Sequence, residues 1–168
     1  MMMFSAPPLA KYIGIGLGIT LLIGGIGFLL NTNSQVRLDA EILKVRSIPA
    51  DDAASLAVVD FRVKNPSGAL FQLKKVTLVV TTAAGQVVEG LPVAQMDLDR
   101  VLAYHKVYGP RYTEMLKERD RIRPKTQEDR TVAGSFSISD RDMQSRKSLV
   151  LKLQDADGVV IEIPETAR

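Results

Sequence analysis

Side chains that could carry out catalysis are scarce in this sequence. It contains one histidine, His105, and no cysteine. These counts exclude thiolate zinc sites, iron–sulfur clusters, cysteine nucleophiles and metal sites built from several histidines. His105 lies at helical spacing from Val101 and Leu102. A lone histidine on such an apolar face is typical of a packed or capping residue rather than of a general base.

The acidic residues do not form a metal or acid–base motif either. Asp155, Asp157 and Gly158 resemble the start of a calcium loop, but the third oxygen ligand and the terminal glutamate are missing, so a hairpin turn is the better interpretation. The pair Asp51–Asp52 suits a loop. The serines lack the glycine-flanked pattern of a nucleophile elbow. The sequence therefore predicts a non-enzymatic protein with no cofactor and no metal.

Tyrosine and arginine are concentrated in one stretch of the chain. Tyr104, Tyr108 and Tyr112 are four residues apart, so they share a face if helical geometry continues past Pro110. A mixed-charge run over residues 117–125 follows. It is a solvated helix face or, alternatively, a surface for an anionic membrane or acidic partner. Because tyrosine and arginine dominate interface energetics, the candidate partner contacts are Tyr104, Tyr108, Tyr112, Arg119, Arg121 and Arg123.

Length and charge limit the remaining function classes. The chain has 168 residues, which fits one globular domain with an appendage. Its formal net charge is +3, from 22 basic and 19 acidic side chains. This excess is too small to indicate a nucleic-acid binder, so we expect no nucleic-acid partner.

The appendage is an apolar N-terminal segment. No charged residue occurs between Lys11 and Arg37, and residues 12–30 are almost wholly apolar. As a helix this run spans about 28 Å, close to the roughly 30 Å hydrocarbon core of a bilayer. We expect a short tail (1–11), a transmembrane helix in the lipid bilayer (12–30) and a linker (31–35). A cleaved signal peptide is the alternative, although apolar cores of signal peptides span only roughly 7–15 residues.

Glycines form two stripes on this predicted helix. Small residues on a common face let two helix backbones approach closely in lipid, so the stripes indicate a homodimer through the helix. The alternative is that glycine is simply common in membrane helices. The first stripe contains Gly14, Gly18 and Gly25, and the second contains Gly16, Thr20, Gly24 and Gly27.

The orientation of the anchor is not set by charge. Lys11 and the terminal amine precede the segment, while Arg37, Lys44 and Arg46 follow it within twenty residues, which is nearly a tie. A short tail before a single anchor and a large C-terminal domain is typical of an exported domain. We therefore expect a single-pass membrane protein whose C-terminal domain lies outside the cytoplasm.

Residues 36–168 carry the alternating pattern of half-buried strands. On residues 57–64, for example, Ala57, Val59, Phe61 and Val63 share one face, and Asp60, Arg62 and Lys64 share the other. The alternation slips by one residue at Leu43 and again at Lys74–Lys75, and the second slip predicts a bulge or a corner. Seven short strands with turns between them predict an antiparallel β-sandwich. The predicted strands are 36–42, 57–63, 71–80, 87–89, 132–138, 149–153 and 159–163.

Residues 95–125 do not alternate and are expected to form a helical insertion. Asp97 is a plausible N-cap, and Leu98, Val101 and Leu102 recur at helical spacing. The pair Gly109–Pro110 ends this helix, and a second short helix is expected around residues 112–116. The insertion is apolar enough to pack on its own sheet, on another protein or on a membrane surface.

One part of the sandwich resembles a known family. Residues 58–64 form a strand that is followed by Asn65-Pro66-Ser67, then by an apolar strand at 76–80, Gly85 and a return strand at 87–90. This succession over Val58–Gly90 resembles the water-stress and hypersensitive-response domain, the type 2 late-embryogenesis-abundant sandwich. The resemblance implies an immunoglobulin-like fold with no catalytic residues.

Together these features predict a mainly β protein in which an immunoglobulin-like sandwich with a helical insertion follows one transmembrane helix. We expect a protein-interaction or structural component of a cell-envelope assembly that binds a membrane or envelope protein. The alternative is a protein that binds a small apolar or lipid ligand between its sheets or beneath the insertion. A deep apolar pocket would favour the ligand, and a filled core with exposed tyrosines would favour the partner.

Overall fold

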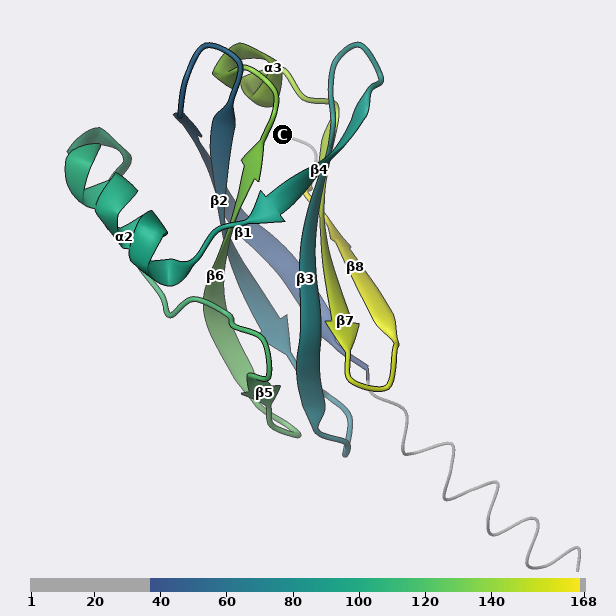
Figure 1. Cartoon of the computed structure of the whole chain (residues 1–168). Coiled ribbons are helices and arrows are strands. Elements are labelled where there is room, and N and C mark those ends of the chain that lie inside the picture. The colour runs from purple at the N-terminus through teal and green to yellow at the C-terminus, as the bar shows by residue number, and fades with distance from the viewer. Residues whose placement is uncertain (1–36, 167–168) are drawn as a thin grey trace, which may run out of the picture. The chain divides into compact units, whose positions relative to one another are not determined.

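The computed structural model describes residues 37–166, which form eight strands, two α-helices and a 3₁₀ turn (Figure 1). The predicted transmembrane helix, its glycine stripes and the 31–35 linker lie outside the described residues. Among residues 37–166, no helix has the length and apolar character needed to cross a bilayer. The elements are β1 (Asp39–Pro49), β2 (Ser55–Lys64), β3 (Phe71–Thr81), β4 (Val87–Pro92), α2 (Gln95–Tyr104), η1 (Lys106–Tyr108), β5 (Arg121–Ile122), β6 (Gln127–Phe136), α3 (Asp140–Gln144), β7 (Ser148–Asp155) and β8 (Val160–Pro164).

The strands are joined in one antiparallel path, β1-β2-β6-β4-β3-β7-β8, with β5 added to β3. Strand β4 links the two halves of the sandwich. Its first part pairs with β3, from Val87 to Gly90, and its last two residues, Leu91 and Pro92, pair with β6. Figure 1 shows β4 crossing between these strands. The prediction of a mainly β, antiparallel sandwich is confirmed.

The main core lies between the two halves. The predicted inward face of β2 is buried, and leucines of β7 face it from the other half. Strict alternation along each strand places these side chains on one surface of the pleated sheet. The main-core residues include Ala57, Val59, Phe61, Val63, Phe71, Leu73, Leu149, Leu151 and Leu153.

The bulge predicted at Lys74–Lys75 is confirmed, and the phase slip at Leu43 is a second bulge. The register of β1 against β2 shifts between Ile42 and Lys44, which leaves Leu43 exposed. The register of β3 against β7 shifts between Leu73 and Lys75. Each shift restores the inward direction of the apolar residues after one extra residue has been accommodated.

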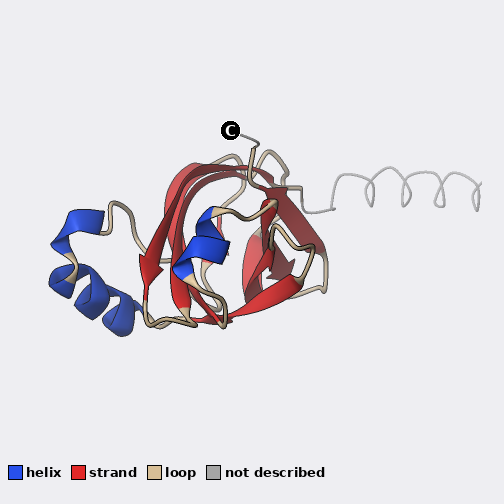
Figure 2. Ribbon diagram, turned by 90° about the horizontal axis from the view of Figure 1, so that it is seen from above, coloured by secondary structure: helices blue, strands red, loops and turns tan. Residues whose placement is uncertain are grey.

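A second, smaller core lies on the outer face of the β1-β2-β6 half, beneath α2. Leu98 and Leu102 of the helix are buried there, and Val101 is partly buried, as their spacing predicted. Figure 2 shows α2 beside this face of the sandwich. The second core contains Ile48, Leu56, Val58, Leu98, Leu102, Met115 and Ala133.

The insertion differs from the sequence prediction in three ways. Helix α2 begins at Gln95, with Ala94 as N-cap, so Asp97 lies in the first turn instead of capping it. The second helix expected at residues 112–116 is absent, because this stretch runs beside β6 and bonds to Thr131. The short strand β5 lies within the stretch that was expected to be helical and pairs with Phe71 and Gln72 of β3.

Helix α3 was also not predicted from the sequence. It spans the five residues Asp140–Gln144, with Ser139 as N-cap and Ser145 as C-cap. The Ser139 hydroxyl accepts a hydrogen bond from the backbone N–H of Asp142, which is the usual N-terminal cap. One apolar side chain, Met143, is buried in the main core. A single apolar residue in five gives no helical periodicity, so the pattern could not reveal this helix.

Candidate functional site

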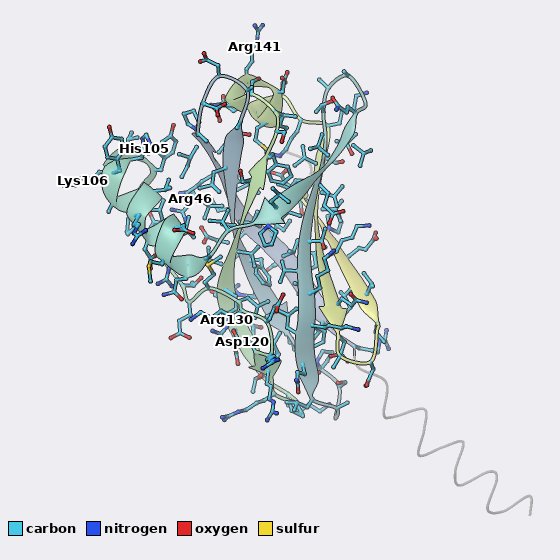
Figure 3. The ribbon with its side chains drawn as sticks, viewed as in Figure 1. Arg46, His105, Lys106, Asp120, Arg130 and Arg141 are labelled. Atoms are coloured by element: carbon cyan, nitrogen blue, oxygen red, sulfur yellow. The ribbon has the colours of Figure 1, made fainter. Side chains whose placement is uncertain are left out.

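A buried ion pair fastens the insertion to the sheet. Arg46 of β1 and Asp60 of β2 are both buried, and their side chains approach to 3.0 Å. The other terminal nitrogen of Arg46 donates hydrogen bonds to the backbone oxygens of Tyr108, at 3.1 Å, and Pro110, at 2.9 Å. In Figure 3, Arg46 lies on the sheet next to α2. One guanidinium group therefore holds the loop after α2 in a defined position.

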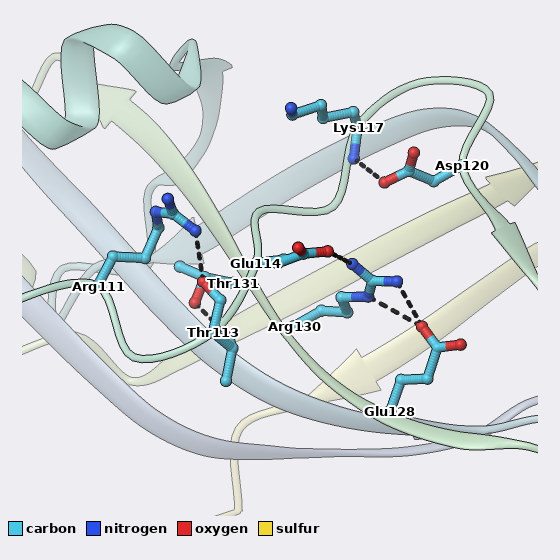
Figure 4. Close-up of polar contacts among 8 residues, drawn as sticks. All are labelled: Arg111, Thr113, Glu114, Lys117, Asp120, Glu128, Arg130 and Thr131. Atoms are coloured by element: carbon cyan, nitrogen blue, oxygen red, sulfur yellow. Dashed lines mark hydrogen bonds and ion pairs between the residues drawn. The ribbon is translucent and has the colours of Figure 1, made fainter.

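The same network continues into β6. The second carboxylate oxygen of Asp60 accepts a hydrogen bond of 2.6 Å from the Thr131 hydroxyl, and this hydroxyl lies 2.8 Å from that of Thr113. The backbone N–H of Leu116 donates to Thr131, and that of Thr131 donates to Glu114. Figure 4 shows Thr113 and Thr131 side by side. Residues 113–116 are thus bonded along the edge of β6.

The sequence places Asp60 on the outer face of β2 with Arg62 and Lys64, but the structure buries it. The same face carries Leu56 and Val58 of the second core, and Asp60 is enclosed by Arg46 and Thr131. Burial of a carboxylate requires a partner, and Arg46 on the neighbouring strand provides it. The available signal was the presence of opposite charges on two strands expected to pair.

The three predicted tyrosines do not share one helical face. Helix α2 ends at Tyr104, with His105 as C-cap, and Gly109 adopts a φ of 76° that directs the chain away from helical geometry. Tyr104 is 84% exposed and Tyr112 is 60% exposed, whereas Tyr108 is half-buried against the second core. Two of the three tyrosine rings are therefore accessible to a partner.

Tyr104, Val107 and Tyr112 form what we call the insertion surface. Val107, on the 3₁₀ turn between the two tyrosines, is 86% exposed. Tyr112 is held by its surroundings: the Arg46 guanidinium lies 5.1 Å from its ring centroid and the Lys44 amine 5.6 Å. Both distances are within the range of a cation–π interaction. The insertion surface is thus apolar, exposed and carried on a fixed backbone.

His105 lies among these rings and not in a catalytic arrangement. Its ring centroid is 4.8 Å from that of Tyr104 and 6.1 Å from that of Tyr108, in edge-to-face geometry. Its backbone N–H closes the helix by donating to Val101. The role of packed or capping residue describes this position. In the described part of the chain, no group of three or more His, Asp or Glu side chains is placed to hold a metal ion.

The three candidate arginines are exposed and lie on a different part of the fold from the tyrosines. Arg119 lies in a turn with a φ of 69°, and its backbone N–H donates a hydrogen bond to the backbone oxygen of Leu73 in β3. Arg121 is in β5, and Arg123 follows it. The structure therefore separates the predicted contact residues into one set beside β1 and another set beside β3.

An apolar groove of about 500 Å³ opens between β3 and β6. Residues that follow β4 border it on one side, and residues 115–118 border it on the other. Val132 and Leu116, which also belong to the main core, line its inner wall. The other lining residues are Lys75, Val76, Pro92, Val93, Ala94, Gln95, Met115, Lys117, Glu118 and Ala133.

A polar bay of about 310 Å³ adjoins this groove. The two cavities share Gln95, Met115 and Lys117 as lining residues, so they are adjacent. The bay is lined by four basic side chains and two acidic ones. These residues are Arg111, Lys117, Arg121 and Arg130, with Glu114 and Asp120.

Two of the basic side chains that line the bay, Arg130 and Arg111, already form ion pairs. Arg130 lies 2.9 Å from Glu114 and also bonds to Glu128 (Figure 4). Burial lowers the pKa of Arg130, but the two carboxylates more than offset this and raise it. Arg111 pairs with Asp99 at 3.0 Å, and its hydrogen bond lowers the pKa of that carboxyl group. No carboxylate pairs with the side chains of Lys117 and Arg121 within residues 37–166.

Comparison with known proteins identifies no family. No family model matches the sequence, and no curated protein matches it. Similar solved structures include a Bordetella pertussis protein provisionally described as ApaA (12% identity, 79% of this chain, 91% of that chain, TM-score 0.38). A second is the structural-genomics target SoR45 (15% identity, 82% of this chain, 85% of that chain, TM-score 0.35). A third is an uncharacterised β-sandwich protein from Clostridium difficile 630 (14% identity, 79% of this chain, 82% of that chain, TM-score 0.34).

Proposed function

We propose that the chain is a non-enzymatic, membrane-anchored interaction module whose insertion surface binds a protein of the cell envelope. The observation that carries this proposal is a rigidly held, solvent-exposed apolar surface. Tyr104, Val107 and Tyr112 are exposed, and the buried Arg46–Asp60 pair fixes the backbone that presents them. A surface ordered before binding loses less conformational entropy when a partner covers it.

Aromatic composition supports a protein as the occupant of this surface. Tyrosine is enriched among the residues that contribute most to the binding energy of protein interfaces, because its side chain combines a large apolar ring with a polar hydroxyl group. The surrounding side chains are charged with both signs, since Asp97, Arg100 and Lys106 are exposed around α2. An apolar centre with a polar rim is the usual anatomy of a protein–protein interface.

The proposal includes a transmembrane anchor at residues 12–30. It also includes an immunoglobulin-like fold for the sandwich. The charge-free run supports the anchor, and antiparallel halves facing across one core support the comparison with the type 2 late-embryogenesis-abundant sandwich. We place the C-terminal domain outside the cytoplasm. Protease added to intact spheroplasts is then expected to cleave at the exposed arginines of Arg119–Arg123, and protection until lysis would reverse this topology.

The insertion surface is tested by replacing its three side chains with serine. Tyr104→Ser, Val107→Ser and Tyr112→Ser, combined in the full chain, are expected to abolish co-purification of a membrane partner. Thermal unfolding is expected to change little, since these side chains are exposed. The matched control changes exposed apolar residues on β4 and β8, Val87→Ser and Val160→Ser, and is expected to retain the partner. Equal loss in both variants would refute the proposal.

A further inference from the structure

We propose that the apolar groove and the polar bay form one binding site for a free fatty acid, with the acyl chain in the groove and the carboxylate in the bay. The site does not include the insertion surface. Nor does it depend on a protein partner. It is defined by an apolar cavity and a positively charged cavity that share a wall at Met115 and Lys117.

The groove exists because the sheet is incomplete at one place. Strand β4 pairs with β3 only as far as Leu78, and β5 pairs with β3 only at Phe71 and Gln72. Between these pairings, Lys75 and Val76 face a gap toward Val132 and Ala133 of β6. The gap extends to side chains of the main core, and eight of the twelve residues that line it are apolar.

The size of the groove fits one acyl chain. Cavities that enclose a single small molecule hold roughly 300–1,000 Å³, and the groove holds about 500 Å³. The polar residues that line it are Lys75, Gln95, Lys117 and Glu118, and the other lining residues are apolar. Transfer of a hydrocarbon chain from water into such a cavity is favoured by about 25 cal/mol for each Å² buried.

The bay supplies charge complementarity for an anionic end. Four basic residues and two acidic residues line it, and two of the basic residues, Arg111 and Arg130, are already paired with carboxylates. Glu114 pairs with Arg130, and Asp120 accepts the backbone N–H of Lys117. The ammonium of Lys117 and the guanidinium of Arg121 remain for a ligand carboxylate. Lys117 lines both cavities, so it lies where chain and head group of an amphiphile would meet.

The test uses the full chain in phosphatidylcholine nanodiscs and a palmitate that carries a photoreactive diazirine near the end of its chain. We expect saturable labelling of groove residues that do not line the bay, among them Val76 and Val132, and we expect excess palmitate to displace the label. The corresponding photoreactive alcohol is expected to need a roughly tenfold higher concentration for half-saturation, because it lacks the charge that Lys117 and Arg121 would pair with.

Two variants and two controls complete the test. Lys117→Glu with Arg121→Glu is expected to raise the half-saturating concentration about tenfold, whereas the control Lys147→Glu, exposed and far from the bay in sequence, is expected to leave it unchanged. Val76→Phe fills the groove and is expected to prevent labelling, with Val160→Phe as its control. A groove that stays unlabelled, labelling spread over exposed apolar residues such as Val107, or equal labelling by acid and alcohol would overturn the proposal.

Discussion

Arg46 and Asp60, on adjacent strands, form a buried ion pair of 3.0 Å directly beneath the helical insertion. The pair joins three parts of the molecule, because Arg46 also bonds the backbone of residues 108 and 110, and Asp60 bonds Thr131 of β6. The position of the exposed tyrosines thus depends on a polar contact inside the protein. Removal of one partner and removal of both are expected to change the stability of the protein by different amounts.

Removal of Asp60 alone is expected to be strongly destabilising. The variant Asp60→Leu leaves the Arg46 guanidinium buried without its counter-charge, which typically costs about 3–5 kcal/mol. Replacement of both residues, Arg46→Met with Asp60→Leu, removes both charges and is expected to recover part of this loss. Urea unfolding of residues 34–168 measures the free energies. A double variant less stable than either single one would contradict this account.

A conservative change at Arg46 is expected to loosen the insertion without unfolding the sheet. Arg46→Lys keeps the charge near Asp60 but loses the planar fork that reaches both Tyr108 and Pro110. Amide hydrogen exchange is expected to accelerate over residues 105–113, while exchange in β2 and β6 changes little. The exposed Arg62→Lys, also on the outer face, is the matched control. Uniform acceleration in all strands would indicate global destabilisation instead.

Close packing at Gly90 predicts a severe effect of a single methyl group. A Cβ atom added there would lie 2.5 Å from the nearest ring carbon of the buried Phe136. Gly90→Ala is therefore expected to destabilise the protein by about 1–3 kcal/mol, the usual cost of overpacking a core. Gly68→Ala is the control, since nothing lies within 4 Å of its added atom. Equal melting temperatures for the two variants would disprove this explanation.

The surface pair between Arg62 and Asp129 gives a pH prediction. A hydrogen bond from Arg62, and then its charge, lower the pKa of the exposed Asp129 carboxyl group. Stability from such a group is present above the unfolded-state pKa of about 4 and is lost as pH falls through the lower folded-state pKa. The stability difference between the native chain and Asp129→Asn is expected to be constant from pH 5 to 8 and to vanish in stronger acid. High salt is expected to reduce it.

The strand framework was predictable because each strand buries one face. Alternation identified the inward residues of β2 and β7, and the two phase slips in it are bulges. Helix α2 was recognised from Leu98 and Leu102, which occur at helical spacing. These signals depend on local periodicity, which a sequence displays directly.

The parts that the sequence did not predict depend on distant contacts. Strand β5 has two residues and is defined by pairing with β3, fifty residues earlier. The burial of Asp60 depends on contacts with Arg46 of β1 and Thr131 of β6. The groove arises where two strands fail to meet. None of these has a local period, so only the assembled fold reveals them.

The single hydrogen-bonded path through all the main strands has a consequence for self-association. Its two terminal strands, β1 and β8, contact each other, so the sheet nearly closes on itself. Free strand edges are templates for pairing between molecules, and closure removes them. Pro92 at the end of β4, beside the gap between β3 and β6, lacks the N–H that an added strand would require. The contact between β1 and β8 and the proline beside the gap therefore both limit the intermolecular sheets that begin aggregation.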